Sequence, residues 1–148
     1  MFLPLNDKQF EFWKLKRSGI LSIDIARLFD ISKQAVSRAL INMDERIEKT
    51  LLEMASANQI EVERVNPERG ILFGHSAPFD ANTIIFVSAR HGMQVWYEHE
   101  GNCGTCKRYT QCIELLWDFA DEMKIKIEKT DDPTKMANEL FEKLRGLT

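Results

Sequence analysis

The chain has 148 residues, of which 44% are hydrophobic and 29% charged, as in a soluble globular protein. No apolar run approaches the roughly 20 residues that cross a bilayer, and residues 1–4 lack the layout of a signal peptide, so we expect a cytoplasmic protein with no membrane partner. The net charge of −3 is uneven: residues 1–41 carry +3 and the remainder −6, which suits a protein that contacts phosphate with one end only.

The first predicted helix begins after Asn6, which can act as its N-cap with Gln9 in the capping-box position. It ends before Gly19. Its apolar stripe is formed by Phe12, Trp13 and Leu15. We expect this helix to support the next two, and its basic end to be solvated at Lys14, Lys16 and Arg17.

Residues 19–40 predict two short helices joined by a tight turn. Ser22 can cap the first helix and Ser32 the second, with the turn at Asp30. The second helix is expected to turn one face inward, formed by Ala35, Val36, Ala39 and Leu40. It leaves outside the residue types that contact base edges and phosphates when a helix enters the major groove, namely Lys33, Gln34, Ser37 and Arg38.

This stretch resembles the helix-turn-helix of LuxR, sigma-factor region four and archaeal Tfx-type regulators. The residues that match the pattern are Leu21, Ser22, Asp24, Ile25, Ala26, Phe29, Ile31, Ser32, Ala35, Val36, Ser37 and Leu40. Phe29 replaces the usual leucine, and Asp30 stands where a turn glycine is common. The resemblance, over roughly residues 5–42, implies a transcription regulator that binds double-stranded DNA through Ser32, Lys33, Gln34, Ser37 and Arg38. The alternative is a helical hairpin with no DNA role.

The second helix is predicted to continue to about Ser56, because no proline or glycine occurs between Ser32 and Pro67. Apolar residues recur along it at steps of three and four, at Leu40, Met43, Ile47, Leu51 and Met54. This stripe is either a dimer seam or a face that packs on the second half of the chain, and we favour the seam. A symmetric homodimer would present two recognition helices to a palindromic site.

The chain therefore divides into a DNA-binding domain with a linker helix, residues 1–58, and a small α+β sensor domain, residues 59–148. The overall class is α+β. The second domain is expected to contain alternating or β-branched strands, a clear β-hairpin and two C-terminal helices. The expected strands are 60–65, 71–74, 83–89, 93–99 and 124–128, with an irregular loop at 75–82 and helices that begin near Tyr109 and Pro133.

Three cysteines, Cys103, Cys106 and Cys112, form a C-x2-C-x5-C cluster. Clustered thiolates in a cytosolic protein favour a zinc ion or an iron–sulfur cluster. In one interpretation a [4Fe–4S] cluster takes three cysteines; the spacing resembles bacterial oxygen-sensing cluster regulators, whose remote fourth cysteine is absent here. In another, His99 completes a tetrahedral zinc site. A third is a dithiol switch that resembles thioredoxin-type loops, and three free thiols are the remaining alternative.

No phosphate-binding loop, G-x-S-x-G or H-E-x-x-H motif occurs, so we expect no enzyme and no catalytic residue. The sequence predicts a dimeric DNA-binding regulator whose metal centre senses redox state, oxidant, nitric oxide or metal supply. Two other functions stay open: a thiol-disulfide redox protein that uses Cys103 and Cys106, and a structural adaptor held together by zinc.

Overall fold

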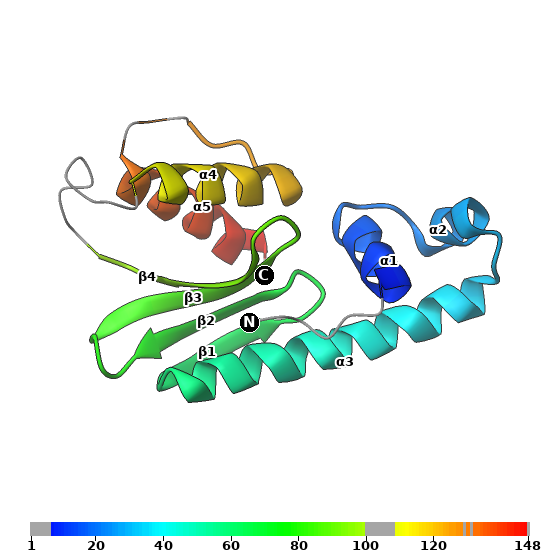
Figure 1. Ribbon diagram of the computed structural model, residues 1–148, viewed down its shortest axis with the longest axis horizontal. Helices are drawn as coiled ribbons and strands as arrows, with labels where there is room; N and C mark the ends of the chain where they lie inside the picture. Colours follow the sequence, from blue (N-terminus) through cyan, green and yellow to red (C-terminus); the bar gives the residue numbers. More distant parts are fainter. Residues whose placement is uncertain (1–6, 100–108, 129, 131, 148) are drawn as a thin grey trace.

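The computed structural model describes residues 7–99, 109–128, 130 and 132–147 (Figure 1). Within these residues the fold is α+β, as predicted, with helices first and an antiparallel sheet after them. No described helix combines the length and the apolar character needed to span a membrane. The elements are α1 Asp7–Arg17, α2 Ser22–Phe29, α3 Lys33–Ala57, β1 Ile60–Asn66, β2 Ile71–Ser76, β3 Ala81–Ser88, β4 Gly92–Tyr97, α4 Tyr109–Glu122 and α5 Pro133–Leu147.

The sheet is a meander in which each strand pairs antiparallel with the next, in the order β1-β2-β3-β4. The predicted hairpin is confirmed as β3–β4, where Ile84 lies opposite Trp96 and Ile85 opposite Val95. The predicted loop at 75–82 is shorter than expected, because β2 continues to Ser76 and β3 begins at Ala81. The proposed cap of the first helix at Asn6 lies outside the described residues.

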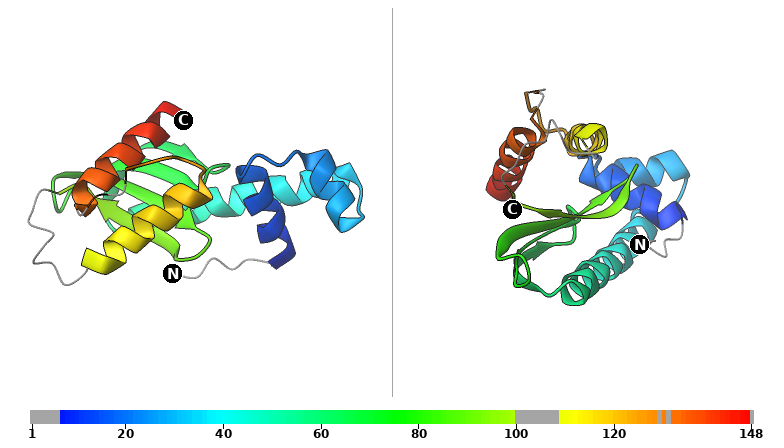
Figure 2. Two further views of the ribbon diagram at one scale, coloured as in Figure 1. Left: turned by 90° about the horizontal axis from the view of Figure 1, so that it is seen from above. Right: turned by 60° about the vertical axis from the view of Figure 1, so that its left-hand side comes forward.

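The sheet lies between helices on both faces: α3 covers one face, and α4 and α5 cover the other (Figure 2). Successive strand residues point to opposite faces, so Leu72 and Ile85 pack in the α3 core, whereas Phe73 and Phe86 pack in the α4–α5 core. Burial on both faces explains why β2 and β3 are nearly continuous apolar runs.

Helix α3 continues without interruption from the turn after α2 to the start of the sheet, as the sequence predicts. Its apolar stripe is buried within the chain itself: Met43, Ile47 and Leu51 have no exposed surface and share one core with α1, α2 and the sheet. The prediction that this stripe is a dimer seam is therefore wrong. The division at residue 58 falls between α3 and β1, and the core crosses it.

The strand expected at residues 124–128 does not form. Lys124 has a left-handed φ of 56° that ends the turn after α4, and the next residues pair with no strand in the described part of the chain. The alternation of Ile125 and Ile127 has another cause, since both side chains pack on the α4–α5 core. The backbone is held instead by α5, where Lys143 donates to the Lys126 carbonyl at 2.5 Å.

Candidate nucleic-acid interface

The turn that joins α2 to α3 is short. Asp30 takes the left-handed conformation, with φ 53° and ψ 50°, as the sequence suggested. The N–H groups of Asp30 and Ile31 close α2 by donating to the carbonyls of Arg27, at 3.3 Å, and Ala26, at 3.0 Å. The chain therefore reverses within a few residues and places α3 against α2.

The N-terminus of α3 favours an anion. The Ser32 hydroxyl accepts a hydrogen bond from the Ala35 N–H at 3.1 Å, which confirms the predicted cap. The first turn carries Lys33 and no acidic residue. Because a helix N-terminus has partial positive charge and unpaired N–H groups, this end attracts phosphate rather than repelling it.

The predicted DNA-contact residues share one side of this turn. Ser32, Lys33, Gln34 and Arg38 are exposed, and Ser37 is half-buried. The opposite side is core, with Val36 fully buried. Ala35 was expected to point inward and is exposed; each residue turns about 100° from the one before, so Ala35 lies beside the buried stripe. Helix α2 and the first turns of α3 stand at one end of the molecule, away from α4 and α5 (Figure 2).

The two predicted caps differ, and the difference is measurable. No side chain caps α2, where Leu21 occupies the N-cap position and Ser22 is already helical. We expect Ser32→Ala to lower the free energy of unfolding by about 1 kcal/mol. Ser22→Ala should change it by less than about 0.5 kcal/mol, as at other surface positions. Urea denaturation of both variants checks this; equal losses would contradict the assigned caps.

Only part of the basic end of α1 is available to phosphate. Lys16 is exposed, whereas Lys14 pairs with Glu11 at 2.6 Å. Arg17 was expected to be solvated and is instead directed into the sheet, where it donates to the Val87 carbonyl at 2.6 Å. Of these three cations, Lys16 is therefore the one that is exposed and forms no ion pair within the described residues.

Trp13 joins α1 to the sheet. Its side chain is almost fully buried, and its indole N–H donates to the Pro67 carbonyl at 3.2 Å. The ring lies against Gly70, where an added Cβ would be 2.8 Å from it. The sequence placed Gly70 only in a turn; the need for a bare backbone there follows from the tertiary contact.

Arg17 extends this junction to α4. Burial lowers its pKa to about 10, and the nearby Glu122 carboxylate opposes that change. Glu122 in turn holds the β3–β4 turn: it accepts from the Ser88 hydroxyl at 2.8 Å, from the Arg90 N–H at 3.2 Å and from the Ala89 N–H. Sequence reasoning missed this junction, since each contact joins distant segments.

A cavity of about 230 Å³ lies beside the N-terminal half of α3, where α1, α3 and the β1–β2 turn meet. Its lining includes Asp44 together with the two other charged groups that face it, Glu68 and Lys16. Burial, the larger cause, and the Glu68 charge raise the pKa of Asp44 to about 6, and the nearby Trp13 indole N–H opposes that change.

This carboxyl makes stability depend on pH. The folded state binds the Asp44 proton more tightly than the unfolded state does. Protonation of Asp44 therefore contributes most to the free energy of unfolding at pH values below the unfolded pKa, and this contribution is lost as pH rises through about 6. We expect Asp44→Asn to stabilise the protein by about 1 kcal/mol near pH 8, after screening, and little near pH 4. Urea unfolding at both values checks this; an equal gain at both would contradict it.

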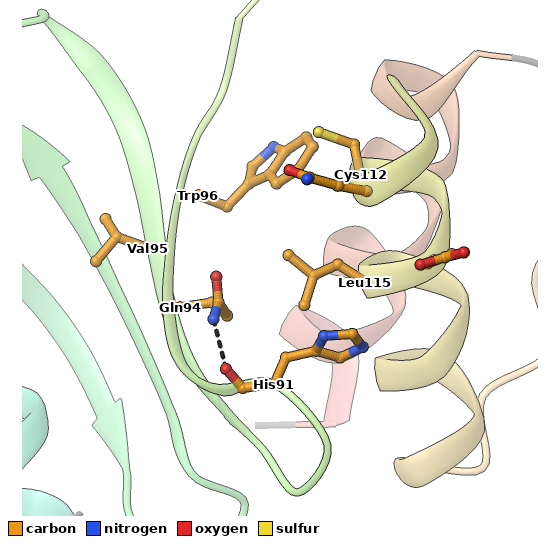
Figure 3. A pocket seen from close by; sticks show the side chains of 8 residues that line it. His91, Gln94, Val95, Trp96, Cys112 and Leu115 are labelled. Atoms are coloured by element: carbon orange, nitrogen blue, oxygen red, sulfur yellow. Dashed lines mark hydrogen bonds between the residues drawn. The ribbon is translucent and has the colours of Figure 1, made fainter. Parts of the chain in front are cut away.

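The predicted metal ligands are only partly described. Cys103 and Cys106 lie outside the described residues. Cys112 is half-buried in the first turn of α4 and lines a pocket between α4 and β4 (Figure 3). The His99 Nδ1 atom lies 2.8 Å from the Tyr97 carbonyl oxygen. Within the described part of the chain, no three His, Cys, Asp or Glu residues are grouped closely enough to hold a metal ion.

Comparisons with protein-family models, with curated proteins and with solved structures give no match for this chain.

Proposed function

We propose that this protein is a transcriptional regulator that binds double-stranded DNA through the first two turns of α3. One observation carries the proposal: Lys33, Gln34 and Arg38 are exposed together on a capped helix N-terminus whose first turn has no acidic residue. Amide and guanidinium groups are the groups that contact adenine and guanine edges in the major groove. A helical hairpin with only a structural role would not need this charge or these side chains.

The proposed regulator acts as a homodimer. A single helix-turn-helix with few free cations binds weakly, and two of them on a two-fold axis combine their contacts at a palindromic site. The acidic remainder of the chain, with a net charge of −6 beyond residue 41, restricts DNA to the helix-turn-helix end.

Selection from a library of random duplexes tests the DNA-binding proposal. We expect the protein to enrich one palindromic motif, with affinity that falls steeply between about 50 and 200 mM salt. A Lys33→Ala, Arg38→Ala double variant should enrich no motif. If the unmodified protein retains no sequence above the level of bulk DNA, the proposed function is wrong.

We further propose a thiolate-bound metal centre at Cys103, Cys106 and Cys112, with His99 as a candidate fourth ligand. The described residues fit this chemistry in one respect. A carbonyl oxygen only accepts, so the His99 Nδ1 atom carries the proton toward Tyr97, and the lone pair of the neutral ring is then on Nε2. A ring N–H bonded to a backbone carbonyl is the usual support of a metal-binding histidine.

Metal analysis after anaerobic purification tests the metal centre. Absorption at about 400 nm together with bound iron indicates a [4Fe–4S] cluster. One zinc ion per chain without visible absorption indicates a tetrahedral zinc site. Cys112→Ala should lower the metal content, and His99→Ala should do so only for zinc. Disulfide reductase activity in a protein without metal would favour the thiol-disulfide function instead.

A further inference from the structure

The sheet has two outer strands, β1 and β4, and they differ in how they are protected. In any antiparallel sheet the outer strand directs half of its backbone N–H and C=O groups away from its neighbour, where another strand can pair with them. Proteins commonly block such an edge with charged side chains or a bulge.

The β1 edge carries both kinds of protection. Glu61, Glu63 and Arg64 are exposed along the strand. The pairing of β1 with β2 also shifts register between Val62 and Arg64, which interrupts the regular ladder. A further strand would meet an irregular backbone and three charges at this edge, so β1 is a poor partner for pairing.

The β4 edge has neither charged side chains nor a bulge to block pairing. From Gly92 to Tyr97 the strand contains no charged residue. Its pairing with β3 is continuous, from Ser88 opposite Gly92 to Thr83 opposite Tyr97. In the described part of the chain, the backbone of residues 93–97 hydrogen-bonds to no main chain other than that of β3. Over the described residues the edge is regular and uncharged, and its backbone can pair with a further strand except at the Tyr97 carbonyl, which already lies 2.8 Å from the His99 Nδ1 atom.

The space beside this edge is also open. A pocket of about 370 Å³ lies between β4 and α4, with Gln94, Trp96 and Leu115 in its wall (Figure 3). Side chains of an added strand that point to this face of the sheet would enter the pocket. Those that point to the other face would lie near Val95 and Tyr97, which are half-buried at the margin of the α3 core.

We propose that two copies of this chain associate by antiparallel pairing of their β4 strands, which joins the two sheets into one. A second copy fits this edge because a two-fold axis brings the same strand of each copy together, so an uncharged strand meets an uncharged strand. The inference deepens the proposed function, and its consequence for DNA rests on that function: the dimer would carry two helix-turn-helix units. Self-association itself is measured without DNA.

Sedimentation of the full chain and three variants tests the interface. We expect the unmodified protein at twice the chain mass of 17.2 kDa. Gln94→Lys places two like charges in the paired region and should sediment as a monomer. Gln94→Ala removes the hydrogen bond from Gln94 to the His91 carbonyl without adding charge, and should remain a dimer. Val62→Lys adds the same charge to the β1 edge, where Val62 is 41% exposed, and should also remain a dimer.

Hydrogen exchange of the unmodified protein gives a second test that needs no substitution. Amides of β4 that face away from β3 should exchange more slowly as protein concentration rises, while β1 amides do not change. A monomer at every concentration, or a dimer that survives Gln94→Lys, would overturn the interface. A β4 dimer that selects no DNA motif would overturn the proposed function alone, and a monomer that selects one would overturn the interface alone.

Discussion

Replacing Arg38 with alanine should weaken binding to the selected DNA by about 10- to 100-fold for each half-site, while the fold is unchanged. The guanidinium is exposed on the second turn of α3 and lies outside the core. Loss of one bidentate contact to a base costs about 1–3 kcal/mol. Both copies of a dimer lose the contact, so the effect on a full palindrome is expected to be larger. Fluorescence anisotropy with a labelled duplex measures it.

Lys49→Ala is the matched control for that experiment. Lys49 is an exposed cation on the same helix, where its Nζ atom lies 4.0 Å from the Glu53 carboxylate. It lies about three turns beyond Arg38, so its removal changes the net charge equally and should alter DNA affinity by less than about twofold. If both variants lose the same affinity, Arg38 acts through net charge and the assigned recognition helix is wrong.

Replacing Gly70 with alanine should lower the free energy of unfolding by about 2–4 kcal/mol. Gly70 has a φ of 71°, which costs an alanine conformational energy. The new Cβ would also lie 2.8 Å from the Trp13 ring and 3.2 Å from the Val87 Cβ. The large ring is buried and cannot move without disturbing the junction between α1 and the sheet. Urea denaturation measures the loss, and the near-ultraviolet signal of tryptophan reports the displaced ring.

Gly146→Ala provides the comparison. Gly146 lies in the last turn of α5, and an added Cβ there meets no atom within 4 Å. Alanine is the better helix former, so this variant should be unchanged or more stable by up to about 1 kcal/mol. A Gly70→Ala protein as stable as Gly146→Ala would contradict the contact between Trp13 and the β1–β2 turn.

Local patterns predicted the helices and strands well because the signals for them lie within a few residues of one another. Ser32 caps α3 through a hydrogen bond to Ala35, three residues away. Asp30 takes the left-handed conformation that its short polar side chain tolerates. The same local patterns gave the β3–β4 hairpin and the full length of α3.

The exposed side of α3 at Lys33, Gln34 and Arg38 followed from the spacing of its apolar residues. The contacts of Cys103 and Cys106 lie outside the described residues, so the metal centre stays a prediction. The approach of two carboxyl groups, Asp44 and Glu68, had no local signal, because they come from α3 and the β1–β2 turn.

The sequence by itself determined the order of the five helices and four strands that the structure describes and most of each apolar side, since helix and strand periodicity are local properties of the chain. The tertiary structure decided what each apolar side contacts. The α3 stripe packs on the sheet of its own chain and not on a second copy, and Ile125 and Ile127 pack on a core without joining a strand. An apolar pattern shows that a face must be covered, but the surface that covers it comes from segments distant in the sequence. The hydrophobic effect is not directional, so burial against any of these segments would lower the free energy of the folded state equally well.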